Sequence, residues 1–130
     1  MLERTPKHRI LILGGSGFLG ESLYKELCQY FKTYATYFTE HSRHLKNKHF
    51  IHYDMGIDEL YPILKTLRPT IIISAIRGPF IQQVYAHECL VDYTQHHNCR
   101  IIFLSSANVF DAYSKFPSFE NDKTLSNSIY

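Results

Sequence analysis

Short runs of apolar or β-branched residues alternate along the chain with segments in which apolar side chains recur every three or four positions. The short runs are typical of buried strands and occupy 10–13, 34–38, 49–54, 70–75 and 100–105. The helical periodicity covers 17–31, 57–67 and 80–97. Asp58 is the expected N-cap of the second helical segment. The polar segment 39–48 is expected to be a loop, with or without a helical turn.

Buried strands separated by helices predict an α/β fold, a parallel sheet with helices on both faces. Right-handed crossovers between the strands give the order 3-2-1-4-5, which is the doubly wound arrangement of the Rossmann type. The length of 130 residues suits one domain, so residues 1–130 are expected to form a single unit. Ligands of such sheets bind beyond the carboxyl ends of the strands. Those ends are where functional residues should lie.

A glycine-rich turn joins the first strand to the first helix. Gly14, Gly17 and Gly20 follow the first apolar run with G-x-x-G-x-x-G spacing. We expect Gly14 to make the tight turn, Gly17 to let a pyrophosphate approach, and Gly20 to let the helix sit close to the strand. The alternative is an ordinary turn without a ligand, but the flanking strand and helix favour a dinucleotide site. The predicted cofactor-binding residues here are Gly14, Ser16, Gly17, Phe18, Leu19 and Gly20.

The segment after the second strand holds the groups that would distinguish NAD from NADP. Glu40 lies 20 residues beyond Gly20, a distance at which a carboxylate commonly binds the ribose hydroxyls of NAD. It comes one or two positions late for the end of the strand. Arg43, with Ser42 beside it, suits the 2′-phosphate of NADP instead. A solvated basic loop is the remaining alternative. We favour NADP over NAD, with Arg43 as its ligand.

Two further strand ends carry residues suited to the same cofactor. Asp54 and Met55 lie at the end of the third strand, where the carboxylate would meet the adenine amino group and the thioether the adenine ring. An aspartate that caps the following helix is the alternative. Ala75, Ile76 and Arg77 lie at the end of the fourth strand and are predicted to line the site. Arg77 would meet a phosphate of the substrate or cofactor, or point to solvent.

Composition argues against several other classes of protein. Hydrophobic residues make up 45% of the chain and its net charge is +2, so neither disorder nor nucleic-acid binding is expected. No apolar run approaches the roughly 18 residues that span a bilayer. Cys28, Cys89 and Cys99 are an odd number without C-x-x-C spacing, as in the reduced thiols of a cytoplasmic protein. The histidines are scattered, so no metal site is expected.

The end of the fifth strand and the segment after it complete a family pattern. This stretch reads Leu104-Ser-Ser-Ala-Asn-Val-Phe-Asp111, then Phe116-Pro, Glu120-Asn-Asp122 and Ser126-Asn-Ser-Ile-Tyr130. With the glycine turn and Leu67-Arg-Pro-Thr-Ile-Ile-Ile73, it resembles the extended short-chain dehydrogenase/reductase family of NAD-dependent epimerases and dehydratases. Its dTDP-4-dehydrorhamnose-reductase-like, sugar-nucleotide-binding branch is the most similar. The resemblance covers essentially the whole chain.

The resemblance implies catalytic roles for Ser106 and Tyr130. Ser106 matches the family's serine or threonine that polarises the substrate, although Ser105 and Ser106 by themselves are ordinary turn residues. Tyr130 matches the catalytic tyrosine, which would pass a proton to a carbonyl oxygen while hydride leaves the nicotinamide. The family's lysine four positions later is absent from this chain. We therefore expect no turnover by this chain alone.

The function implied by the resemblance is that of an NAD(P)-dependent oxidoreductase or epimerase acting on a sugar nucleotide. The chain would be its amino-terminal, cofactor-binding half, without the later strands and the carboxyl-terminal substrate-binding part. The alternative is a non-catalytic NAD(P)-binding or regulatory module of the same fold. The expected partners are the nucleotide cofactor and a sugar-nucleotide substrate, with a homodimer as the protein assembly. Neither nucleic acid nor membrane is expected, and the expected location is the cytoplasm.

Overall fold

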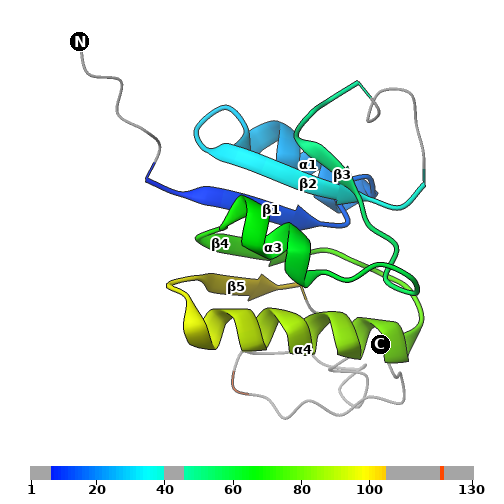
Figure 1. The fold of residues 1–130 in the computed structure, drawn as a ribbon. Helices are drawn as coiled ribbons and strands as arrows, with labels where there is room; N and C mark the ends of the chain where they lie inside the picture. Colours follow the sequence, from blue (N-terminus) through cyan, green and yellow to red (C-terminus); the bar gives the residue numbers. More distant parts are fainter. Residues whose placement is uncertain (1–6, 40–45, 105–120, 122–130) are drawn as a thin grey trace.

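The computed structural model describes residues 7–39, 46–104 and 121 of the chain. In this part, five strands form one sheet in the order β3-β2-β1-β4-β5, and every neighbouring pair is parallel (Figure 1). The strands are β1 (Arg9–Leu13), β2 (Lys32–Tyr37), β3 (Phe50–His52), β4 (Ile71–Ser74) and β5 (Arg100–Phe103). The predicted strand order 3-2-1-4-5 is confirmed.

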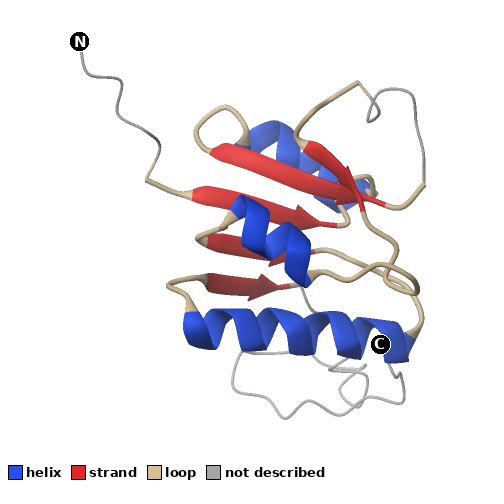
Figure 2. Cartoon of the chain, in the orientation of Figure 1, coloured by secondary structure: helices blue, strands red, loops and turns tan. Residues whose placement is uncertain are grey.

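Within the described residues, three helices cover the two faces of the sheet. They are α1 (Phe18–Leu27), α3 (Tyr61–Leu67) and α4 (Phe80–His96). In Figure 2, α1 lies behind the sheet and α3 lies in front of it. Because side chains alternate along a strand, Ile10 and Ile12 of β1 pack on the side of α1, while Leu11 and Leu13 pack with residues of α3 and α4. The central strand is thus buried on both faces, and the doubly wound α/β fold is confirmed.

Helix α1 is shorter than its apolar periodicity predicts. It begins at Phe18 and ends at Leu27, and the amide of Phe31 then donates to the carbonyl of Leu27 at 2.9 Å. Leu19, an apolar residue of the periodic segment 17–31, is 50% exposed, whereas Gly20 is buried. Phe31 lies beyond the helix but still packs on the hydrophobic cluster that contains Ile10 and Ile12. The apolar periodicity therefore continues past the last residue of α1 into one further turn, which the hydrogen bond between Phe31 and Leu27 closes.

The second helical segment begins later than predicted, and Asp58 does not cap it. Leu60 is the N-cap of α3, and Ile57, expected on the apolar face, is 83% exposed. The amides of Ile57 and Asp58 donate to the carbonyl of Asp54 instead, at 3.1 and 2.7 Å. Residues 54–58 thus form a turn of their own before α3.

Among the described residues, no helix is both long and apolar enough to cross a membrane.

Candidate functional site

The predicted cofactor-binding residues that the structure describes all follow carboxyl ends of strands. In a parallel sheet these ends share one edge. The glycine turn follows β1, Asp54 and Met55 follow β3, and Ala75–Arg77 follow β4. Arg43, Ser106 and Tyr130 lie outside the described residues, as does Glu40, so their roles stay predictions from sequence.

The glycine turn is packed as its spacing predicts. Gly14 has a φ of +80°, and a Cβ placed there would lie 2.8 Å from the carbonyl oxygen of Ala75. A side chain is excluded at this position both by the conformation and by the neighbouring backbone. A Cβ on Gly20 would overlap the carbonyl oxygen of Gly14. The expected tight turn and close packing of the helix are therefore confirmed, and they bring the glycine turn against the loop that follows β4.

Thr36 on β2 anchors the glycine turn from the other side. The amide of Gly14 donates to Thr36 Oγ1 at 3.0 Å, and the amide of Gly15 donates to the Thr36 carbonyl at 2.7 Å. Thr36 is only 2% exposed. This role of Thr36 was not predicted, because nothing local in the sequence links it to a turn 22 residues earlier. The signal that could have indicated this role is a threonine near the carboxyl end of β2, the strand that pairs with β1.

The N-terminus of α1 has the features of an anion-binding site. Gly17 is the N-cap, with extended backbone at φ −74° and ψ 168°, and no side-chain hydrogen bond caps the helix there. Backbone N–H groups in a first helical turn lack intrahelical acceptors and lie at the positive end of the helix dipole. A Cβ on Gly17 would meet only the Gly14 carbonyl oxygen, at 3.4 Å. The position is therefore open to an approaching phosphate.

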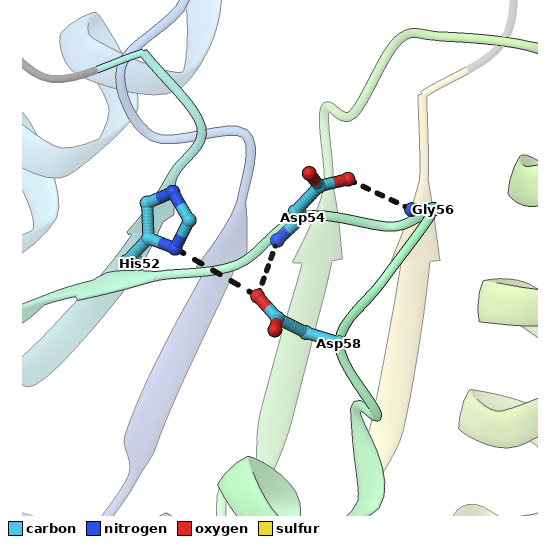
Figure 3. A network of polar contacts seen from close by, with 4 residues as sticks. All are labelled: His52, Asp54, Gly56 and Asp58. Carbon is cyan, nitrogen blue, oxygen red and sulfur yellow. Dashed lines mark hydrogen bonds and ion pairs between the residues drawn. The ribbon is translucent and has the colours of Figure 1, made fainter.

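Asp54 and Asp58 organise the turn after β3 (Figure 3). Asp54 Oδ1 accepts from the amide of Gly56 at 2.9 Å, and Asp58 Oδ2 accepts from the amide of Asp54 at 2.9 Å. Asp58 Oδ2 also lies 3.7 Å from His52 Nδ1. Asp54 thus caps this turn and not α3, so the helix-capping alternative is wrong. Its contact with adenine stays a prediction.

Met55 links the third and fourth strand ends. A Cβ on Gly78 would lie 2.6 Å from Met55 Cε, so the thioether methyl group packs directly on the end of the loop after β4. The amide of Ala75, at the start of that loop, donates to the Leu13 carbonyl at 2.9 Å. The loops after β1, β3 and β4 are therefore joined by contacts.

The described groups with clearly shifted pKa values are tyrosines and cysteines, and burial raises the pKa of each. Burial, and secondarily the charges of Cys89, Asp58 and Asp54, raises the pKa of Tyr53 to about 12. Burial also raises the pKa of Cys99 to about 11 and the pKa values of Cys89 and Tyr93. None of these groups is activated as a nucleophile or base.

Among the described residues, no group of three His, Cys, Asp or Glu side chains could hold a metal ion.

Two cavities lie near this edge without coinciding with the predicted cofactor residues. One of about 840 Å³ runs along α4 and β5, from Gly78 past His87 to Phe103, and no predicted cofactor-binding residue lines it. The other, of about 290 Å³, is lined in part by Met55 and Asp58. Of the predicted cofactor-binding residues, Met55 alone lines either cavity among the described residues. The cofactor prediction therefore rests on the backbone geometry of the strand ends.

No family model matches the sequence. A curated relative is the dTDP-4-dehydro-6-deoxyglucose reductase of Escherichia coli, which is 26% identical over 147 residues covering 95% of this chain and 46% of that protein. The chain therefore spans about half the length of this relative. This relative is named as a reductase of a dTDP-sugar, as is the branch of the family that the sequence resembles.

Two solved structures have the same fold. L-threonine 3-dehydrogenase from Trypanosoma brucei superposes with a TM-score of 0.79 and 16% identity, over 95% of this chain and 44% of that one. The dTDP-glucose 4,6-dehydratase of Bacillus anthracis, in complex with NAD, superposes with a TM-score of 0.72 and 16% identity. That match covers 93% of this chain and 45% of the other. At these identities the likeness supports the fold.

Proposed function

We propose that this chain, which the comparisons support as a member of the extended short-chain dehydrogenase/reductase family, is an NAD(P)-binding domain. The domain would serve an oxidoreductase or epimerase that acts on a sugar nucleotide. The substrate class follows the names of the curated reductase and of the dehydratase structure. In this proposal residues 1–130 form one unit, located in the cytoplasm, where its three free cysteines would stay reduced.

The observation that carries the proposal is the geometry of the glycine turn. Gly14 turns the chain, Gly20 lets α1 pack on that turn, and the N-terminus of α1 has no side-chain cap. This arrangement stands after β1, where the strand order changes direction between β2 and β4. In doubly wound sheets a dinucleotide lies across that point with its pyrophosphate on the helix N-terminus.

The proposal assigns the two halves of the dinucleotide to opposite sides of β1. The adenosine half lies toward β2 and β3, with Asp54 and Met55 at the adenine and Arg43 at the 2′-phosphate of NADP. The nicotinamide half lies toward β4 and β5, near Ala75–Arg77. Bound there, the nicotinamide would supply or take a hydride. Ser106 would hold the substrate carbonyl, and Tyr130 would exchange a proton with its oxygen.

A non-catalytic NAD(P)-binding or regulatory module of the same fold is the second candidate. A homodimer also belongs to the proposal. Carbonyl reduction with NADPH would favour the enzyme, whereas tight binding without turnover would favour the module.

The test is a thermal melt of the chain with and without NADPH or NADH. At about a hundredfold excess over the Kd, binding to the folded chain alone adds about 2.7 kcal/mol to its stability. We expect a larger rise in Tm with NADPH, and Arg43→Ala should remove the difference between the two cofactors. A cooperative melt that neither cofactor shifts would contradict the proposed function.

A further inference from the structure

Helix α4 holds the loop after β4 at both of its ends. At one end, the hydroxyl of Ser74 lies 2.8 Å from Nε2 of His87. At the other, Nε2 of Gln83 donates to the carbonyl oxygen of Gly78 at 2.7 Å. The segment between these two ends is Ala75–Arg77. We call Ser74, Gly78, Gln83 and His87 the α4 clamp.

The α4 clamp has two arms, the hydrogen bond between Ser74 and His87 and the hydrogen bond between Gln83 and Gly78. The imidazole of His87 connects them. His87 Nδ1 lies 2.6 Å from the backbone carbonyl oxygen of Gln83. A carbonyl oxygen can only accept, so Nδ1 carries a proton, and Nε2 of the neutral imidazole is then the acceptor. The hydroxyl of Ser74, which is 2% exposed, therefore donates to His87. One histidine tautomer thus sets the direction of both hydrogen bonds.

His87 also locates α4 against the neighbouring strand. Its ring meets the ring of Phe103 edge-on, with centroids 4.9 Å apart and an interplanar angle of 83°. Phe103 is the β5 partner of Ser74 in the sheet register. The imidazole therefore contacts the last residue of β4 and the last residue of β5 together. This fixes the helix at the height of the strand ends.

A serine–histidine hydrogen bond is also the arrangement of a nucleophile and its base. Ser74, however, is buried as the last residue of β4. The cavity of about 840 Å³ is lined by His87 but not by Ser74. A substrate carbonyl in that cavity would reach the imidazole and not the hydroxyl. The pair is therefore suited to holding the loop and not to hydrolysis.

We propose that the α4 clamp positions Ala75–Arg77 for the nicotinamide half of the dinucleotide, with His87 and Gln83 as positioning residues. This inference rests on the proposed function. β4 lies on the opposite side of β1 from β2 and β3, so a dinucleotide crossing at β1 meets this loop with the half that is remote from Asp54. Ala75 is tied separately to Leu13 of β1. Losing the clamp therefore shifts the part of the loop beyond Ala75.

The test compares a whole dinucleotide with a probe that lacks the nicotinamide half. NADH, NADPH and ADP are titrated against the wild-type chain, Ser74→Ala and Gln83→Met, each of which removes one arm of the clamp. We expect the dinucleotide Kd to rise about two- to tenfold, the range for one lost hydrogen bond. The ADP Kd should rise less than the dinucleotide Kd, since the adenosine half meets this loop only through the contact of Met55 with Gly78.

Thr33→Val is the matched control. Thr33 is also a buried hydroxyl, 1% exposed, and it donates to the Phe31 carbonyl at 3.0 Å at the opposite end of the sheet. The control should lower the Tm without changing the ratio of the dinucleotide and ADP Kd values. A purely structural role for the α4 clamp predicts this same result for Ser74→Ala and Gln83→Met.

An unchanged ratio in both clamp variants, with wild-type binding intact, would overturn the positioning role alone. A wild-type chain that binds none of the probes would overturn the proposed function, and the inference with it. Gln83→Met keeps the size of a partly exposed side chain, so it carries the test if Ser74→Ala does not fold.

Discussion

The α-carbon of Gly20 faces the carbonyl oxygen of Gly14 so closely that a methyl group on Gly20 would overlap that oxygen. The first turn of α1 therefore packs directly on the turn that leaves β1. Gly17, midway between the two, makes no such contact, because a methyl group there would have its nearest neighbour at 3.4 Å. Gly14 and Gly20 are thus needed for close packing, whereas Gly17 between them is left open to a ligand.

The first prediction uses this separation. Gly20→Ala should destabilise the chain by about 1–3 kcal/mol, as overpacked positions do. Gly17→Ala should cost about 1 kcal/mol or less, because alanine fits the backbone there but is a poor N-cap. Gly17→Ala should nevertheless weaken dinucleotide binding at least about tenfold, since its methyl group occupies the phosphate position. Urea titrations and binding titrations of both variants measure this. Normal NADPH affinity in Gly17→Ala would contradict the placement of the pyrophosphate.

The second prediction concerns the acceptor role of Asp58 in the turn after β3. Asp58→Ala removes the oxygen that accepts from the Asp54 amide and should cost about 0.5–1.5 kcal/mol in a urea titration. Asp58→Asn keeps an oxygen acceptor and should cost less. Glu59→Ala, at the neighbouring exposed position, is the control. Equal losses in Asp58→Ala and Asp58→Asn would mean that charge, and not the hydrogen bond, matters.

The third prediction concerns the reactivity of the thiols. Burial raises the pKa of Cys99 to about 11 and raises that of Cys89, so at pH 8 only about one Cys99 in a thousand is a thiolate. Cys28 is exposed. Iodoacetamide at pH 8 should therefore alkylate Cys28 well before the other two, as read by mass spectrometry of peptides. In urea the order should disappear. Equal rates in the folded chain would be inconsistent with this burial.

The fourth prediction concerns alkaline pH. Tyr53 has a pKa of about 12 in the folded chain and an ordinary value of 10 when unfolded, so folding holds its proton more tightly. The resulting stability is fully present below pH 10 and is lost as the pH rises through 12. Tyr53→Phe has no such proton, so its urea midpoint should fall less steeply than that of the wild type between pH 10 and 12. Parallel curves would show that Tyr53 contributes nothing to the slope.

Much of the fold could be predicted because its signals are local. The apolar run at 10–13 and the spacing of the three glycines lie within a dozen residues of one another. They correctly indicated a buried central strand and the turn and helix that follow. The error at Ile57 and Asp58 has a local origin as well. Apolar spacing of three or four residues does not distinguish a helix from a turn whose amides bond to the carbonyl of Asp54.

The sequence by itself determined the order of the elements, the parallel sheet and the strand ends at which the candidate site lies. Only the tertiary structure decided which distant polar groups hold those ends, such as Thr36 at the glycine turn and His87 at Ser74. The physical reason is that hydrophobic periodicity reports which face of an element is buried. A hydrogen-bond partner, in contrast, depends on strand register and on how far a helix is displaced along the sheet, which arise only when the elements pack.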